Sequence, residues 1–364
     1  MSARSPRASR ARSVADRRPK VWVSQPLFDD VVAQLGQYFD LAMTGDVTRY
    51  TPQMLAEQLA HVDGALITLN ERIGAAEIAH APQLRAIANV GVGYNNLDID
   101  ALSAAGILAS NTPDVLTETT ADLGFALLMA TARRITESER WLRGGQWGQW
   151  SFQTMLGADI HGSTLGILGM GRIGQGIARR GAHGFGMRVL YHNRSRLPEA
   201  TEAEVGAQYV DLDTLLAQVD HLVLVLPYNA SSHHIIDADA LAKMKPTATL
   251  VNIARGGIVD ELALADALAN GRLAAAGLDV FEGEPTVRPE LLALHNIVLT
   301  PHIGSASQAT RRAMVQLAVD NLTAALGHGP HAGHPPSAIN ADAVAAAKAG
   351  GATVGGKKID DAKR

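Results

Sequence analysis

The chain has 364 residues, 47% hydrophobic but only 4% aromatic, which is enough to fill two domains of roughly 100–200 residues each with mainly aliphatic side chains. Its formal net charge of −4 provides no basic field for nucleic acid or for an anionic membrane. The lack of cysteine excludes disulfides, thiol catalysis and thiolate metal ligands, and no apolar run approaches the ~20 residues that a membrane helix needs.

The first nineteen residues differ in composition from the rest. Six arginines face the single acid Asp16, and serine, alanine and proline fill most other positions. No apolar segment follows that would make this a secretory signal, although the composition is similar to that of a transit peptide. We predict that residues 1–19 are a disordered basic extension, or that translation starts further downstream. Residues 336–364, rich in alanine, glycine and lysine, predict a disordered tail.

Short β-branched runs then alternate with alanine- and leucine-rich helical stretches, a pattern typical of parallel sheets with crossover helices. The first set predicts one α/β domain over 20–111, with a helix at Pro52–Ala60. Its strands are predicted at Val21–Ser24, Ala65–Leu69, Arg85–Val90 and Ile107–Ala109.

A second set of six strands, beginning at Thr164, predicts a dinucleotide-binding sheet because the strands are apolar on both faces and separated by helices. Long helices over Leu116–Trp141 and Ser305–Leu326 are expected to join the domains. The chain would then leave the first domain and return to it, with a hinge over a cleft. The six strands are Thr164–Leu168, Arg188–His192, His221–Leu226, Thr249–Ile253, Ala275–Asp279 and Ile297–Leu299.

The sharpest local motif is a glycine loop, Gly169-Met170-Gly171-Arg172-Ile173-Gly174, between a predicted strand and a predicted helix. Gly169 permits a tight turn, Gly171 lets the backbone approach a pyrophosphate, and Gly174 lets the helix pack close to the strand. The helix N-terminus would present free N–H groups and a positive dipole end to the phosphates. A structural glycine turn is the alternative.

The second strand of this domain ends at Asn193, Arg194 and Ser195, about twenty residues past the glycines, where NAD enzymes usually carry an acid for the ribose hydroxyls. A carboxylate would repel a 2′-phosphate, whereas arginine binds one with charge-assisted hydrogen bonds. The segment therefore predicts NADP(H) as the preferred cofactor, with NAD(H) possible. The alternative is that these arginines are solvated loop charges.

Three later segments carry residues suited to reducing a 2-oxo acid. Arg255 and Asp279 lie at or just past strand C-termini, the edge where ligands bind in such sheets. The permanently charged fork of Arg255 suits a substrate carboxylate and carbonyl. His302 suits proton donation near neutral pH, and Glu284 would orient His302 and favour its charged form.

These motifs resemble those of the D-isomer-specific 2-hydroxyacid dehydrogenase family, from about Val21 to Leu326. The resemblance implies an α/β fold of two Rossmann-like or flavodoxin-like domains with parallel sheets and an active-site cleft between them. Residues 20–111 and 303–335 would bind substrate and 112–302 the dinucleotide, usually in a homodimer. The motifs that carry it are Val90–Asn96, Asn111–Pro113, the glycine loop, Asn252–Gly257, Gly277–Pro285 and Pro301–Gly304.

The resemblance also implies roles for single residues. The family's catalytic arginine, glutamate and histidine fall on Arg255, Glu284 and His302, and its carboxamide-binding aspartate falls on Asp279. Its substrate-binding loop, which holds the carboxylate through backbone N–H groups, falls on Val92 and Gly93, with Arg255 as a further substrate ligand. The implied dinucleotide site comprises Gly169, Gly171, Arg172, Ile173, Gly174, Asn193, Arg194, Ser195, Leu226, Pro227, Ile253, Asp279, His302 and Gly304.

Within the family the sequence is most similar to the glyoxylate/hydroxypyruvate reductase group, through 193–195 and Trp147–Trp150. It departs from the commoner pattern at Tyr228–Asn229, where Leu-Thr is frequent, and at Asn95, where Asp is frequent. Two alternatives therefore stay open: a reductase of a bulkier 2-oxo acid such as 2-ketogluconate, and a dinucleotide-sensing binding protein similar to corepressors. Formate dehydrogenases carry Gln at the position of Glu284, which argues against that chemistry.

The remaining predictions concern partners and location. We expect a cytoplasmic homodimer that acts on a small 2-oxo or 2-hydroxy acid and binds neither nucleic acid nor a membrane. No metal is predicted, because the adjacent His233 and His234 cannot both face one ion from a regular element. The other histidines weighed, His61, His80, His161 and His183, have no partner at ligand spacing and are interpreted as surface or structural residues.

Overall fold

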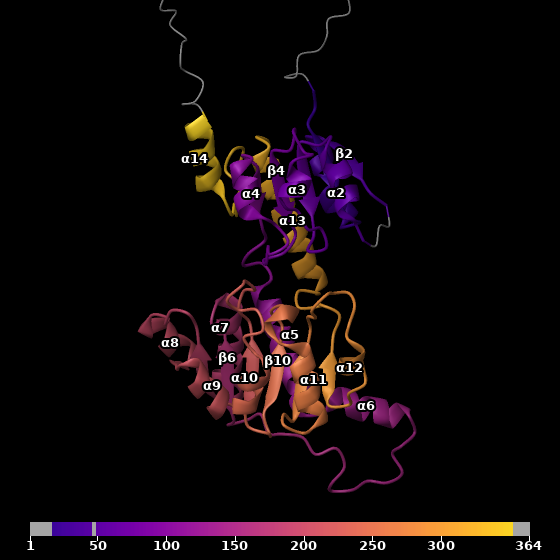
Figure 1. The fold of residues 1–364 in the computed structure, drawn as a ribbon, viewed down its shortest axis with the longest axis vertical. Coiled ribbons are helices and arrows are strands. Elements are labelled where there is room, and N and C mark those ends of the chain that lie inside the picture. Colours follow the sequence, from indigo (N-terminus) through magenta and orange to yellow (C-terminus); the bar gives the residue numbers. More distant parts are fainter. Residues whose placement is uncertain (1–16, 46–48, 352–364) are drawn as a thin grey trace, which may run out of the picture. The chain divides into compact units, whose positions relative to one another are not determined.

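The computed structural model describes residues 17–45 and 49–351. They form two compact units: one contains the described residues up to Pro113 and from Arg312 onward, and the other is Asp114–Arg311. Each unit has its own parallel sheet with helices packed beside it (Figure 1). The α/β prediction with two parallel sheets is confirmed. Residues 1–16, which make up most of the predicted basic extension, lie outside the described residues.

The first unit contains a five-stranded parallel sheet in the order β2-β1-β3-β4-β5, the flavodoxin-like order. Its inner strands β3 and β4 are buried along their whole length, and they are apolar except for Asn89 at the end of β4. The edge strand β2 was not predicted, because its residues are only half-buried or exposed and begin with Asp40. The elements are β1 (Lys20–Val23), α1 (Asp29–Val32), β2 (Asp40–Met43), α2 (Pro52–Leu59), β3 (Gly64–Ile67), α3 (Ala75–Ile78), β4 (Ala86–Asn89), α4 (Ile99–Ala104), β5 (Leu108–Ser110) and α14 (Ala341–Gly351), with α13 (Gln308–Ala325) leading into the unit.

The predicted disorder of 336–364 is wrong for 336–351, and residues 352–364 lie outside the described residues. Ala338 forms an antiparallel bridge with Ser110, next to β5. The Asn340 side chain, itself buried, accepts a hydrogen bond from the Ala109 N–H at 2.8 Å, and Val344 of α14 is buried. The prediction failed because composition alone does not reveal that a few apolar and amide side chains have partners on the sheet.

The second unit contains a seven-stranded parallel sheet in the order β12-β11-β10-β9-β6-β7-β8. Counted from β6, this is the Rossmann order with one added strand at the β12 edge. All six predicted strands are present, and the short outer strand β8 is an addition. The elements are α5 (Thr117–Ala132), α6 (Ile135–Arg143), β6 (Thr164–Leu168), α7 (Arg172–Arg179), β7 (Arg188–His192), α8 (Glu199–Val205), β8 (Ala207–Tyr209), α9 (Leu212–Gln218), β9 (His221–Leu224), α10 (Ala238–Lys243), β10 (Thr249–Asn252), α11 (Glu261–Ala269), β11 (Ala275–Leu278), α12 (Pro289–Leu292) and β12 (Ile297–Leu299), with short helical turns at Leu35–Gln37 in the first unit and Arg180–Gly184 and Gly256–Ile258 in the second.

The predicted helix Leu116–Trp141 is two helices in the structure, α5 and α6. Arg134 between them adopts a left-handed backbone with φ of 52°, which ends the first helix. The Ala132 carbonyl accepts a hydrogen bond from the Ala158 N–H instead of continuing the helix, and Gly157 approaches so closely that a Cβ there would lie 2.4 Å from the Ala132 oxygen. The break thus comes from a later loop, which helical periodicity does not report.

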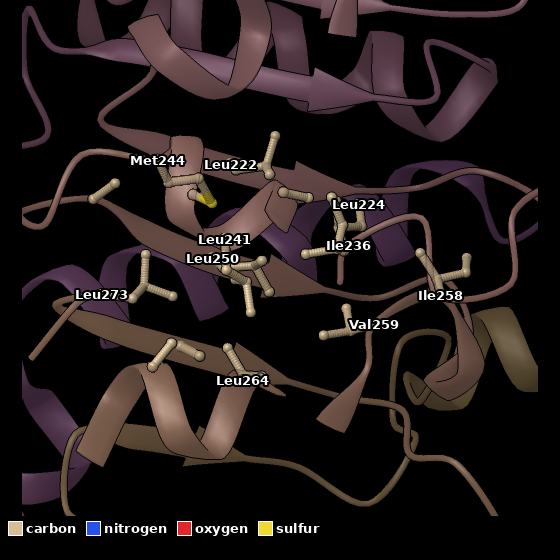
Figure 2. Close-up of a cluster of buried hydrophobic side chains, with 14 of the residues drawn as sticks. Leu222, Leu224, Ile236, Leu241, Met244, Leu250, Ile258, Val259, Leu264 and Leu273 are labelled. Carbon is tan, nitrogen blue, oxygen red and sulfur yellow. The ribbon is translucent and has the colours of Figure 1, made fainter. Parts of the chain in front are cut away.

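A large apolar core lies on one face of this sheet, between β9, β10 and β11 and the helices α10 and α11 (Figure 2). Leu222, Leu224 and Leu250 from the strands meet Leu241 and Leu264 from the helices, all fully or almost fully buried. Each such leucine contributes about 1.5–3 kcal/mol by leaving water. This packing fixes the strand ends from which the loops of the candidate site begin. In the described ranges, no helix is both long and apolar enough to cross a bilayer.

Candidate active site

The glycine loop joins β6 to α7 as expected. Gly169 has φ of +104°, and a Cβ there would lie 2.6 Å from the Leu226 nitrogen, so only glycine fits. A Cβ on Gly174 would lie 2.3 Å from the Gly169 oxygen, which shows how closely the helix approaches the turn. A Cβ on Gly171, by contrast, would meet no described atom within 4 Å. The space beside the N-terminus of α7 is therefore open, as a bound pyrophosphate requires.

The segment after β7 contains no acid at 193–196 and presents Arg194 and Ser195 as exposed residues. Asn193 is turned inward, because its side-chain oxygen accepts a hydrogen bond from the Met170 N–H at 2.6 Å. Asn193 thus fixes the glycine loop in addition to any contact with a ligand. Arg172, at the start of α7, pairs with Asp114 at 2.8 Å, with both side chains mostly exposed.

Arg255 follows β10 in a loop that is folded by the side chain of Asn252. That side chain accepts a hydrogen bond from the Ala254 N–H at 3.0 Å and donates to the Arg255 carbonyl at 2.9 Å. The Arg255 guanidinium is half-buried; burial lowers its pKa, while the negative charge of Glu284 opposes that shift. A guanidinium keeps its charge at any ordinary pH, so the site holds a fixed cation.

Glu284 and His302 form the central pair of the site. The His302 Nδ1 lies 2.8 Å from Glu284 Oε2, and because an ionised carboxylate only accepts, Nδ1 is the donor. The other oxygen of Glu284 accepts a hydrogen bond from the Phe281 N–H at 2.8 Å. Burial alone would raise the pKa of Glu284, but the hydrogen bond and charge of His302 lower it overall. Nε2 of His302 is the ring nitrogen that does not contact Glu284.

Asp279 holds the loop that carries His302. One carboxylate oxygen accepts hydrogen bonds from the Thr300 hydroxyl at 2.6 Å and the Ile303 N–H at 2.8 Å, and the other accepts from the Gly304 N–H at 2.8 Å. Burial raises the pKa of Asp279 despite these donors. The three bonds keep His302 in its left-handed conformation, with φ of 52°. Further lone pairs remain for a carboxamide.

The loop that carries Arg255 contacts the loop that carries Glu284, and this contact was not predicted from the sequence. A Cβ on Gly256 would lie 1.9 Å from the Phe281 carbonyl carbon, so the two backbones are in direct contact. The buried Glu261 accepts a hydrogen bond from the Glu282 N–H at 2.6 Å and holds the same loop from the other side. Gly256 belongs to the motif Asn252–Gly257, but the spacing of residues in the sequence does not show that it contacts the backbone at Phe281.

His233 and His234 come together with Glu282, the one group of three possible metal ligands found in the described ranges. They do so because His234 is left-handed, with φ of 50°, and not part of a regular element. The centroids of the two imidazole rings lie 3.9 Å apart, and the ring planes are inclined by 24°. We assign them contacts within the chain: His233 pairs with the Tyr228 hydroxyl at 3.1 Å, and His234 with Glu282 at 3.4 Å.

The other predicted site residues lie as follows. Leu226 and Pro227 lie in the loop after β9, where Leu226 is next to the glycine loop, and Ile253 follows β10. Tyr228 packs its ring against Gly257, where a Cβ would lie 2.8 Å away. Val92 and Gly93 belong to the first unit, in the loop after β4, whereas the predicted catalytic and dinucleotide residues belong to the second.

The sequence of this chain matches a family model and the sequences of known enzymes. Residues 125–304 match the family model described as "D-isomer specific 2-hydroxyacid dehydrogenase, NAD binding domain". A glyoxylate reductase from Thermococcus onnurineus is 45% identical over 311 residues, which cover 84% of this chain and 92% of the relative. Glyoxylate/hydroxypyruvate reductase B from Klebsiella pneumoniae is 44% identical over 310 residues, which cover 85% of this chain and 95% of the relative.

A solved structure has the same fold. The NADPH-dependent glyoxylate/hydroxypyruvate reductase of Sinorhizobium meliloti, in complex with NADP and malonate, aligns with a TM-score of 0.78 and 35% identity. The alignment covers 89% of this chain and 97% of the other. The likeness therefore extends over both units and is not limited to the dinucleotide-binding fold.

Proposed function

Because this chain belongs to the D-isomer-specific 2-hydroxyacid dehydrogenase family, we propose that Arg255, Glu284 and His302 reduce a short 2-oxo acid of the glyoxylate/hydroxypyruvate type. The product is the 2-hydroxy acid, in the D form where C2 is chiral. The observation that carries the role assignment is the 2.8 Å bond from His302 to Glu284, in loops that follow the same sheet as the glycine loop.

The residues have distinct tasks in this proposal. When bound, the reduced nicotinamide dinucleotide supplies the hydride that adds to C2 of the 2-oxo acid. His302 gives its Nε2 proton to the oxygen at C2, while Glu284 holds the ring through Nδ1 and balances its positive charge. Arg255 binds the substrate and stabilises the negative charge that develops on that oxygen. Val92 and Gly93 bind the substrate carboxylate through backbone N–H groups.

NADP(H) is the proposed preferred cofactor. The exposed Arg194 and the lack of an acid at 193–196 support this choice, since a carboxylate would repel a 2′-phosphate that a guanidinium attracts. Asp279 would meet the carboxamide, and the open space at Gly171 the pyrophosphate.

Assembly into a homodimer is also proposed. The segment after α6 has an unusual concentration of large apolar side chains that are 53–85% exposed. They are Trp147, Trp150, Phe152 and Leu156. Figure 1 shows this segment extending as a long loop away from the sheet of its unit. A second copy of the chain would cover these side chains. The cytoplasmic location stays a prediction from the sequence.

A substrate panel tests the proposal. Glyoxylate, hydroxypyruvate, pyruvate and 2-ketogluconate should be offered with NADPH and with NADH, and the loss of absorbance at 340 nm recorded. We expect the largest kcat/KM for glyoxylate or hydroxypyruvate with NADPH, with turnover on the order of 1–10³ per second. A preference for 2-ketogluconate would contradict the substrate assignment. Dinucleotide binding without turnover of any acid would indicate a sensor.

A further inference from the structure

The loop after β4 has its carbonyl groups captured at three successive residues. The Gly91 carbonyl accepts from the Thr112 N–H at 3.0 Å. The Val92 carbonyl accepts from the Asn111 side-chain amide at 2.8 Å, and the Gly93 carbonyl from the Asn89 side-chain amide at 3.0 Å. All of these groups belong to the first unit.

Capture of the carbonyls determines where the N–H groups point. A trans peptide unit is planar, so the N–H of each residue points opposite to the carbonyl of the residue before it. The bond to Gly91 thus orients the Val92 N–H, the bond to Val92 orients the Gly93 N–H, and the bond to Gly93 orients the Tyr94 N–H. Over residues 17–45 and 49–351, none of these three N–H groups has a hydrogen-bond acceptor.

The capturing groups are themselves held firmly. Asn89 is fully buried, and its oxygen accepts a hydrogen bond from the Asn96 amide at 3.2 Å. The backbone carbonyl of Asn111 accepts from the Asn321 amide at 3.1 Å and from the Ser337 hydroxyl at 2.7 Å. The three N–H groups are therefore oriented before any ligand arrives. Successive N–H groups that point the same way form an anion-binding nest.

We propose that Asn89 and Asn111 are positioning residues, which hold the N–H groups of Val92, Gly93 and Tyr94 outward as a preformed nest for the substrate carboxylate. The proposal rests on the proposed function and extends it in two ways. It adds the Tyr94 N–H as a third donor, and it assigns each asparagine to a donor: Asn111 to the Gly93 N–H and Asn89 to the Tyr94 N–H. An ionised carboxylate accepts about four hydrogen bonds and can use all three donors.

The test replaces each asparagine by leucine, which keeps the number and branching of the side-chain heavy atoms but removes the donor. Asn70→Leu, at an exposed asparagine of the same unit, is the matched control. In Asn111→Leu we expect the KM for glyoxylate to rise about tenfold or more, the scale of one charge-assisted hydrogen bond. The dissociation constant of NADPH should stay within about twofold, because the dinucleotide residues lie in the other unit.

Malonate, present in the relative's complex, gives a readout that does not depend on turnover. Its dissociation constant from the NADP-loaded protein, measured by calorimetry, should rise by a similar factor in both variants. Asn89 is fully buried, so if Asn89→Leu does not fold, the half-buried Asn111 decides the question alone. A folded Asn111→Leu protein with unchanged KM and unchanged malonate affinity would overturn the proposal, as would an equal loss of NADPH affinity.

The two proposals fail in different ways. If the unaltered protein reduces glyoxylate but the asparagine variants match it, the nest is wrong and the reductase assignment stands. If the unaltered protein reduces no 2-oxo acid, the reductase assignment fails. Weaker malonate binding in Asn111→Leu would then still support the nest as a carboxylate site.

Discussion

Gly256 lies where the loop of Arg255 crosses the peptide between Phe281 and Glu282, and it leaves no room for a methyl group. The crossing sets the distance between the cation and the loop of Glu284, although Gly256 has no side chain to offer a substrate. Asp279 has a comparable role for His302, through three hydrogen bonds. Gly256 and Asp279 thus determine how the polar groups of the site converge.

Gly256→Ala should therefore damage both stability and activity. The added methyl group would have to displace the backbone at Phe281, because an atom 1.9 Å away is far inside contact distance. We expect a loss of about 1–3 kcal/mol in the free energy of unfolding, as for other overpacked sites, and a lower kcat. Urea unfolding checks the first value. Gly184→Ala is the control, since a Cβ there meets nothing within 4 Å. An equal free energy of unfolding and an equal kcat in the two variants would contradict this role of Gly256.

The segment between β7 and α8 is the element that we propose to set cofactor preference. Its far end is tied down by Glu202, which accepts hydrogen bonds from Arg196 at 2.7 and 2.9 Å and from the Tyr191 hydroxyl at 2.6 Å. The Tyr191 hydroxyl in turn accepts from the Leu197 N–H at 2.8 Å. Arg196 is thus occupied within the protein, and Arg194 is the residue that we assign to the 2′-phosphate.

Cofactor kinetics test this division between the two arginines. Arg194→Ala should raise the KM for NADPH about tenfold or more, the scale of a charge-assisted bond, while the KM for NADH changes by less than about twofold. Arg188→Ala, an exposed arginine at the other end of β7, should change neither value. If NADPH and NADH were affected equally by Arg194→Ala, the residue would have no role in recognising the 2′-phosphate.

The Glu202 cluster also predicts a pH dependence of stability. Hydrogen bonds from Arg196 and Tyr191, opposed by burial, lower the pKa of Glu202 from 4.5 to about 2. Below about pH 4.5 Glu202 is protonated in the unfolded chain but stays ionised in the folded protein. The stabilising contribution of ionised Glu202 to the free energy of unfolding is therefore fully present above that pH and is lost as pH falls towards 2. Glu202→Gln should flatten the fall in unfolding free energy in that window. Glu204→Gln, exposed on α8, should follow the unaltered protein.

The strands and the glycine loop were predictable from the sequence because their signals are local. Gly169 and Gly174 occupy positions that no other residue fits, and buried parallel strands are apolar without interruption. Long-range partners left no such signal. The break at Arg134 is made by 157–158, and the segment around Asn340 is ordered by β5. Asn89 and Asn111 stood beside or inside the quoted motifs, but only the structure shows which carbonyls they hold.

For the whole molecule, the exposed aromatic segment predicts self-association. Light scattering of the purified protein should give twice the 38.4 kDa of one chain. We choose Phe152 for substitution, because its side chain is 85% exposed. The centroid of its ring lies 4.6 Å from that of Trp150. Phe152→Glu should shift the mass towards one chain, because a buried unpaired charge is costly. Leu292→Glu, at an exposed leucine on α12, should leave the mass unchanged. A monomer before any change would refute the dimer.

The most direct test of the central claim is the rate of NADPH oxidation with glyoxylate in the unaltered protein and in His302→Ala, with NADPH affinity measured in both. His161→Ala, at an exposed histidine of the same unit, is the control. Loss of the proton donor should lower kcat by roughly 10²–10⁴-fold while the dissociation constant of NADPH stays within about twofold. Full turnover in a folded His302→Ala protein would contradict the assignment of Glu284 and His302 as the pair that protonates the substrate.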